Sequence, residues 1–118
     1  MEKVYYSLED ARNILPEVAK RFRKILRMKN SLELLDSFQI ESEEYNMEFD
    51  IISLELQKRY HKIMHNMLDE IQKLALIGVI VKDIDEGLVD FYSFHDNQDI
   101  LLCWKFGEKT INYWHDVE

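Results

Sequence analysis

An acid, a thiol and an imidazole in the last third of the chain are the side chains whose types could do chemistry together. They are Asp90, Cys103 and His115. The same types form Cys-His-Asp nucleophilic sites, in which the imidazole activates the thiol. They are also three of the ligand types that a zinc ion takes. Either chemistry requires that the fold bring the three side chains within a few ångströms of one another.

The register of the predicted strands decides whether these side chains meet. A turn centred near residue 96 would place Asp90 opposite Leu102 or Cys103. A turn centred near residues 108–109 would place Cys103 opposite Trp114 or His115. The three would then lie on adjacent strands, which are about 4.8 Å apart. A slip of one residue would send a side chain to the opposite face of the sheet.

A purely structural interpretation of the same residues stays open. Cys103 would be a small core side chain, because free cysteines are often buried and unreactive. Asp90 would cap a turn or pair with a nearby base, and His115 would lie at the surface.

A second polar set lies at predicted strand ends. Lys82, Asp83, Lys105 and Glu108 stand beside turns, and Trp104 precedes Lys105. Together they are candidates for a shallow ligand-binding site. The alternative is two ion pairs that hold the strand ends together, each contributing ~1 kcal/mol or less if exposed.

A third set combines two histidines and an acid on a predicted helix. His61 and His65 are four residues apart and Asp69 follows one turn later, a spacing that can hold a metal ion. The intervening Lys62-Ile63-Met64 lacks the glutamate of a metalloprotease helix. The alternative interpretation is a solvated helix face, and we expect neither a metal nor another cofactor in this protein.

The elements that must position these sets begin with a helix start at Ser7, whose side chain can cap the first turn. Apolar residues then recur at alternating steps of three and four, with coiled-coil-like regularity. This stripe contains Leu8, Ala11, Leu15, Val18, Phe22, Ile25 and Leu32. Pro16 lies inside the pattern and predicts a short first helix followed by a kink or a restart.

Residues 36–46 lose this period and turn acidic, which predicts a loop between two helices. The second helix has a stripe formed by Leu56, Tyr60, Ile63, Met67, Leu74 and Ile77. Because each helix has one apolar face, the two should pack antiparallel as a helical hairpin over residues 7–77. Gly78 then ends the second helix.

From residue 79 the hydrophobic period changes to about two, which predicts a β-meander over residues 79–115. The expected strands are 79–82, 88–92, 100–106 and 110–115, with a loop over 94–99. The expected fold is therefore α+β: a long antiparallel helical hairpin packed with a small three- to four-stranded antiparallel meander.

Composition limits the class of protein. The chain has 118 residues, 47% of them hydrophobic, which suits one domain over residues 1–118. A net charge of −8 disfavours a nucleic-acid binder. The single cysteine cannot form an internal disulfide, and we see neither a signal peptide nor an apolar run approaching the roughly 20 residues of a membrane span. We expect a cytoplasmic protein without membrane association.

Charge is uneven along the predicted helices. Residues 11–30 hold seven basic side chains and one acid, whereas residues 31–50 hold seven acids and no base. One interpretation is a solvated face next to an acidic hairpin tip. The other is a docking surface for an anionic partner, or head-to-tail self-pairing of opposite ends.

The C-terminal string is specific enough to suggest a family. It runs through Val81-Lys82-Asp83, Gly87-Leu88-Val89-Asp90-Phe91, residues 101–108, Ile111 and Trp114-His115. With Ser7-Leu8-Glu9 and Leu15-Pro16-Glu17 near the start, the chain resembles an uncharacterised prokaryotic family, domain of unknown function 2203. The resemblance covers nearly the whole chain and implies important residues rather than a reaction. Residues 96–99 lack the family's hairpin glycine, and the family's glycine- and arginine-containing tail is absent after Glu118, so we expect no function from that tail.

Three functions follow from these observations. The expected one is a non-enzymatic assembly module that self-associates through its helices as a homodimer, because the stripes offer more apolar surface than one thin hairpin buries. The second is a small enzyme, or a ligand- or metal-binding protein, with its site on the meander. The third is an RNA-binding accessory that uses the basic stretch from Arg12 to Lys29. The sequence leans against an enzyme and indicates no protein partner other than a second copy.

Overall fold

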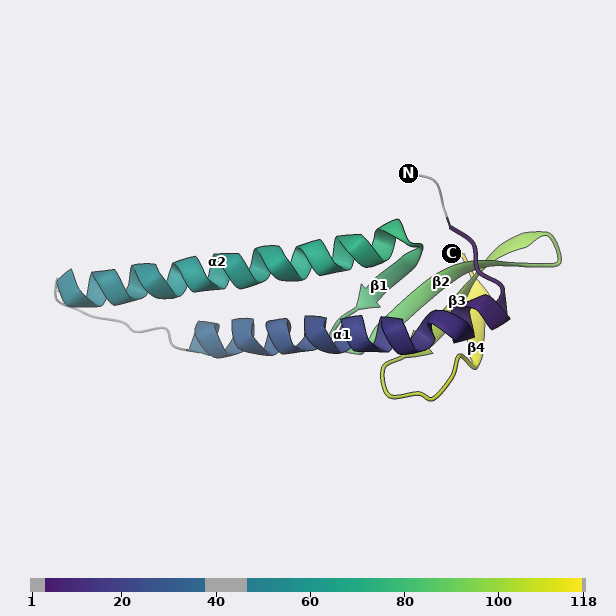
Figure 1. The fold of residues 1–118 in the computed structure, drawn as a ribbon, viewed down its shortest axis with the longest axis horizontal. Coiled ribbons are helices and arrows are strands. Elements are labelled where there is room, and N and C mark those ends of the chain that lie inside the picture. The colour runs from purple at the N-terminus through teal and green to yellow at the C-terminus, as the bar shows by residue number, and fades with distance from the viewer. Residues whose placement is uncertain (1–3, 38–46, 118) are drawn as a thin grey trace.

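The computed structural model describes residues 4–37 and 47–117, which form two helices and four strands (Figure 1). The elements are α1 (Leu8–Ser37), α2 (Met47–Leu76), β1 (Val79–Asp83), β2 (Leu88–His95), β3 (Gln98–Lys105) and β4 (Tyr113–Asp116). The predicted α+β fold is confirmed, because the helices pack together and the strands form one antiparallel sheet. The predicted interhelical loop falls mostly on residues 38–46, which lie outside the described residues.

The first helix begins as the sequence predicted. The Asp10 amide donates a hydrogen bond to the Ser7 hydroxyl at 3.0 Å, and the Ala11 amide donates to the Ser7 carbonyl. Ser7 is therefore the N-cap, and it satisfies amides that the first helical turn would leave unpaired.

The predicted break at Pro16 is wrong, because α1 is one helix from Leu8 to Ser37. Pro16 is exposed, while the flanking Leu15 and Val18 belong to the buried side of the helix. Proline removes one helical hydrogen bond, but packing of the apolar stripe holds the turns on both sides of it in place. Six of the seven predicted stripe residues are buried, and Leu8 is exposed.

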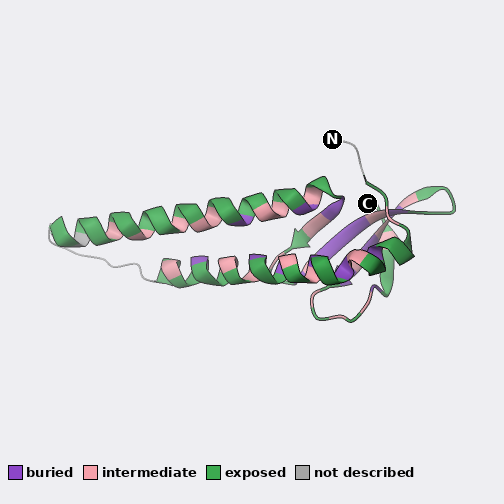
Figure 2. Cartoon of the chain, in the orientation of Figure 1, coloured by how far each residue is buried: buried purple, intermediate pink, exposed green. Residues whose placement is uncertain are grey.

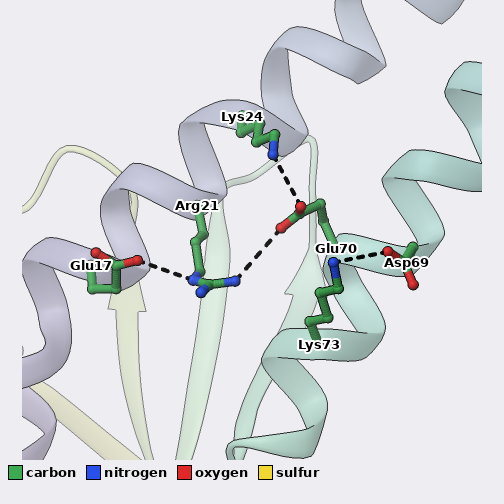
Figure 3. Close-up of polar contacts among 6 residues, drawn as sticks. All are labelled: Glu17, Arg21, Lys24, Asp69, Glu70 and Lys73. Carbon is green, nitrogen blue, oxygen red and sulfur yellow. Dashed lines mark hydrogen bonds and ion pairs between the residues drawn. The ribbon is translucent and has the colours of Figure 1, made fainter.

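The second helix runs back along α1 (Figures 1 and 2), and its Met67 and Leu74 are buried in the common core. Charged side chains close one edge of this contact. Glu70 of α2 lies between Lys24 and Arg21 of α1, at 3.1 and 3.8 Å (Figure 3). Among the described residues, no helix has an apolar stretch long enough to cross a membrane.

Gly78 ends α2 and turns the chain into the sheet, as predicted. Its φ is +85°, and its amide donates to the Ala75 carbonyl at 3.0 Å. A side chain here would place its Cβ 2.7 Å from the Cβ of Val4, so both the backbone angle and the packing require glycine.

Residues 4–6, which we call the N-terminal segment, explain that close approach. The Tyr6 amide donates to the Tyr92 carbonyl at 2.7 Å, and the Tyr5 ring stacks on Phe94 with centroids 4.2 Å apart. The segment therefore lies along β2, immediately beyond the start of β1.

The strands follow one another across the sheet in the order β1-β2-β3-β4, as a meander does. The predicted loop over 94–99 is wrong, because β2 and β3 stay paired up to His95 and Gln98. Asp96 and Asn97 alone make the turn, with φ values of 50° and 63°. Two residues with positive φ are typical of the tightest hairpin turn, and Asp and Asn tolerate that conformation better than other side chains do.

The last strand starts at Tyr113 instead of the predicted residue 110. Residues 110–112 are held by α1, because Arg12 donates a hydrogen bond to the Ile111 carbonyl at 3.0 Å and the Ile111 side chain is buried. Residues 110–112 lie against the helix, and the chain pairs with β3 only from Tyr113 onward.

The two faces of the sheet differ. Alternate residues on one face, which we call the inner face, are buried in the common core with the helices (Figure 2). They include Val89, Phe91, Ile100, Leu102 and Trp104. The Phe22 ring of α1 meets the Trp104 ring edge to face, with centroids 6.5 Å apart. The intervening residues form the outer face, and this face carries the acid, the thiol and the imidazole.

Candidate functional site

Asp90, Cys103 and His115 converge on the outer face of the sheet. Asp90 of β2 pairs directly with Cys103 of β3, which is one of the two predicted registers. One ligand atom from each of the three side chains lies within 4.8 Å of the other two. The strands therefore gather an acid, a thiol and an imidazole at one place, as the first of the two sequence interpretations required.

The predicted register between β3 and β4 is wrong, although the convergence survives. Cys103 lies opposite Tyr113, where Trp114 or His115 was expected, and His115 lies opposite Leu101. Tyr113 and His115 are two residues apart on one strand, so they point to the same face. A shift of one residue would instead have placed Trp114 beside the thiol.

The carboxylate of Asp90 is deeply buried, and one of its two oxygens lacks a hydrogen-bond partner. The residue is 3% exposed, and its Oδ1 atom makes no hydrogen bond. The buried Nε2 atom of His115 also makes none, and it lies 3.6 Å from that oxygen. A buried polar atom left without a partner costs about 1–3 kcal/mol, so two of them facing each other need an explanation.

The contact made by the other ring nitrogen of His115 shows that this nitrogen carries a hydrogen. Nδ1 lies 2.9 Å from the backbone carbonyl of Asp116. A carbonyl only accepts, so Nδ1 carries a hydrogen, and in the neutral imidazole the lone pair is then on Nε2, which faces Asp90. Metal-bound histidines are oriented in the same way, by a carbonyl or carboxylate on the nitrogen that does not bind the metal.

The thiol of Cys103 is held in its protonated form. Burial raises its pKa from the ordinary value of 9.0, and the negative charge of Asp90 and a hydrogen bond with Asp90 raise it further. Lys82 acts in the opposite direction, and Glu108 adds to the rise. Since the thiolate is the reactive form, this environment does not prepare Cys103 for nucleophilic attack.

The spacing of the three ligand atoms suits a tetrahedral ion. Zinc lies about 2.0–2.3 Å from N, O and S ligands, so two ligands of one ion are about 3.3–3.8 Å apart. The Asp90–His115 distance of 3.6 Å falls inside this interval. The Cys103 sulfur lies within 4.8 Å of both other ligand atoms.

The second polar set does not gather into a site, because its members have local roles. Asp83 accepts from the Glu86 amide at 3.0 Å and caps the β1–β2 turn. Glu108 accepts from the Lys105 amide at 2.7 Å and closes the turn after β3. The indole of Trp104 donates to the Glu108 carbonyl at 2.9 Å and belongs to the core.

The two lysines of that set stay exposed near one end of the sheet. Lys82 lies where the pairing of β1 with β2 is irregular, and Lys105 is the last residue of β3. Lys82 acts on the outer-face site only through its charge, by lowering the pKa of Cys103.

The third set, on α2, does not form a metal cluster in the described part of the chain. His61, His65 and Asp69 are all exposed, and Asp69 pairs with Lys73 of the same helix at 3.1 Å (Figure 3). Asp90, Cys103 and His115 are the one set of potential metal ligands that the described residues bring together.

Sequence reasoning missed the contribution of Asp116. This residue acts through its backbone carbonyl, which every residue type has, so the sequence holds no signal for it. Asp116 directly follows His115, so the contact depends on local backbone and side-chain angles that no residue pattern specifies.

The uncharacterized conserved protein family DUF2203 matches residues 4–118 of the chain. The match therefore spans both helices, the sheet and the outer-face site. Neither the curated proteins nor the solved structures contain a significant match.

Proposed function

Because the chain belongs to the uncharacterized conserved protein family DUF2203, whose description assigns no reaction, we propose a function from the site alone: binding of a divalent transition-metal ion. Asp90, Cys103 and His115 are the ligands. This proposal replaces the sequence-based expectation of no cofactor, and it develops the metal-binding alternative for the meander.

The two buried atoms without partners, Oδ1 of Asp90 and Nε2 of His115, are the observation that carries the proposal. In the neutral imidazole both atoms bear lone pairs and lie 3.6 Å apart, so a cation between them satisfies both at once. A thiolate, an imidazole and a carboxylate form a donor set that suits zinc, whereas magnesium and calcium prefer oxygen ligands.

Three protein ligands leave a fourth coordination position. The carboxylate lies at the bottom of the site, while Cys103 and His115 keep partial exposure. The fourth position therefore opens toward solvent, where water or another ligand completes the coordination. Metal binding displaces the thiol proton, because zinc binds the thiolate.

Calorimetric titration with zinc tests the proposal, with cobalt as a spectroscopic substitute. We expect one ion per chain and a cobalt–thiolate charge-transfer band. Cys103→Ser should abolish the band, and His115→Gln should weaken binding at least tenfold, in line with the role of each ligand. His95→Gln is the matched control, because His95 is on the same sheet but pairs with Asp96 at 3.4 Å. Equal zinc affinity in the wild type and in Cys103→Ser would refute the proposal.

A nucleophilic thiol enzyme is the alternative that we do not propose. Burial and the Asp90 charge raise the pKa of Cys103, and an activated nucleophile needs the opposite shift. Alkylation of the metal-free protein at neutral pH checks this choice, and a Cys103 that reacts faster than a free thiol would reverse it.

Self-association is a second candidate function, and exposed apolar side chains on the helices favour it. Met47, Ile51 and Leu54 of α2 are each more than half exposed. Large exposed apolar groups on a helix that already buries another face are typical of assembly surfaces. The solution mass at tens of micromolar tests a homodimer, and a monomer under those conditions would contradict it.

RNA binding through the basic stretch of α1 is not proposed. Arg21 and Lys24 pair with Glu70, and Lys29 pairs with Asp85. These contacts engage cations that a phosphate backbone would need. A cytoplasmic location remains part of the proposal, since a reducing compartment keeps a free thiol available as a ligand.

A further inference from the structure

The exposed side of α2 carries a second stripe, distinct from the one that packs on α1. Its members recur at alternating steps of three and four along the helix. They are Met47, Ile51, Leu54, Lys58, His61, His65, Leu68 and Gln72, and every one of them is exposed. We call this set the outer stripe.

Four of these side chains are large and apolar. Ile51 is 57% exposed and Leu68 is 55% exposed, although the opposite side of the helix already buries Met67 and Leu74. A helix that only packs on one neighbour needs a single apolar stripe. The alternating three-four spacing of the second stripe is the spacing by which two helices pair.

We propose that a second copy of this chain docks antiparallel on the outer stripe of α2, an inference that rests on the self-association proposed above. Around a twofold axis near the middle of the stripe, Ile51 meets Leu68 of the second copy. Leu54 then meets His65 of the second copy, and Lys58 meets His61 of the second copy. The stripe is therefore complementary to itself, as a twofold interface requires.

Charge selects the antiparallel direction. Glu55 and Lys62 lie along one edge of the stripe, so antiparallel pairing sets Glu55 beside Lys62 of the second copy, twice by symmetry. Parallel pairing would instead set Asp50 close to Glu55 of the second copy, which repels. Within the chain Glu55 has a 3.6 Å contact with Lys58, and both side chains are exposed, so Glu55 exchanges this partner at little cost.

Two features limit the strength of association through this interface. The central pairs of Lys58 with His61 are polar, so the apolar contacts gather toward the two ends of the stripe. Glu48 and Asp69 meet with like charge, although Lys73 lies 3.1 Å from Asp69 and offsets it. The stripe spans about 38 Å of helix.

Light scattering and sedimentation of the full chain test the interface. At tens of micromolar we expect twice the chain mass of 14.3 kDa. Ile51→Glu and Leu68→Glu should each give monomers with unchanged helix content. Leu34→Glu is the matched control, because Leu34 is an equally exposed leucine on α1, and it should leave the dimer intact.

A charge exchange tests the direction. Glu55→Lys and Lys62→Glu should each weaken association several-fold, and the double variant should restore it. A wild-type monomer would overturn self-association together with this interface. A dimer that survives Ile51→Glu and Leu68→Glu, or a double variant that restores nothing, would overturn this interface and leave self-association standing.

Discussion

The inner and outer faces of the sheet are made by the same strands, yet the inner face buries apolar side chains and the outer face buries a carboxylate. Val89 and Phe91 point to the inner face and are fully buried among apolar neighbours. Asp90, between them, points to the outer face, is almost as deeply buried, and leaves one oxygen without a partner. The inner face gains stability from burial, whereas on the outer face the buried Asp90 oxygen costs stability until a cation or a hydrogen-bond donor pairs with it.

The largest effect that separates the faces is expected from Trp104→Ala. Removing this inner-face side chain should lower the free energy of unfolding by about 3–5 kcal/mol, because it leaves a cavity between the sheet and Phe22. Cys103→Ser, on the other face of the same strand, should cost about 1 kcal/mol or less in metal-free protein. Urea denaturation measures both.

Equal losses of unfolding free energy in Trp104→Ala and Cys103→Ser would contradict this difference between the two faces. Should Trp104→Ala fail to fold, Val89→Ala serves instead, with an expected loss of about 2 kcal/mol from the lost burial.

Zinc should produce the next largest effect, and only through the outer face. At a free concentration of about 100 times the dissociation constant, a ligand that binds only the folded chain stabilises it by about 2.7 kcal/mol. We expect this gain in the wild type and in Val89→Ala, and at most about 1.4 kcal/mol in His115→Gln, whose affinity should fall at least tenfold. Thermal unfolding with zinc and with a chelator measures it, and an undiminished gain in His115→Gln would place the ion elsewhere.

Asp90→Asn should raise the stability of the metal-free protein by about 1–2 kcal/mol. The amide can donate a hydrogen bond to Nε2 of His115, so both atoms that lack partners become satisfied. The same change should remove the stabilisation by zinc. Denaturant unfolding after chelation tests this, and a metal-free variant less stable than the wild type would show that the Asp90 oxygen costs nothing as it stands.

Glu70→Gln should have a smaller effect, because this residue belongs to neither face of the sheet. Its carboxylate pairs with Lys24 and Arg21 across the helices (Figure 3). Exposed and half-exposed pairs of this kind contribute about 1 kcal/mol or less, and the loss should shrink as salt is added. Asp69→Asn, which breaks only a contact within α2, is the control and should change less still.

The smallest effect is expected in alkali. The unfolded chain releases the Cys103 proton near its ordinary pKa of 9.0, whereas the folded chain holds it to higher pH. Raising the pH from about 8 to about 10 should therefore favour unfolding, and Cys103→Ser should lose less stability over that range. Tyr6 adds to the alkaline loss in both proteins, because burial raises its pKa from 10.0. An identical pH dependence for the two proteins would contradict this contribution.

The helices and the order of strands could be predicted from the sequence because each depends on local spacing. The cap at Ser7, the stripe of α1 and the glycine that ends α2 are all short-range signals, and all three are confirmed. Pro16 led to a wrong prediction because the loss of its helical hydrogen bond is also a local effect. The packing that outweighs this loss involves residues far along the chain.

The outer-face site could be predicted in part. The pairing of Asp90 with Cys103 follows from a turn centred between Asp96 and Asn97, whereas the sequence placed this turn only near residue 96 and left Leu102 as the alternative partner. The pairing of Cys103 with Tyr113 depends on how residues 110–112 attach to α1 through Arg12, and no local pattern announces that contact. In the observed register Cys103 lies opposite Tyr113, two residues away from the predicted pairing with His115. A shift of two residues keeps each side chain on the same face, so His115 lies on the predicted face.

The N-terminal segment has a consequence for the order of folding. Tyr5 donates a hydrogen bond to Asp99, 94 residues away, and Tyr6 pairs with Tyr92. Contacts across so much chain form slowly, because a long loop must close first, whereas the hairpin of α1 and α2 and the turn at Asp96 are local. Docking of the first residues should therefore be among the last steps of folding, and a chain still emerging from the ribosome cannot complete its sheet until its C-terminal strands are free to receive its own beginning.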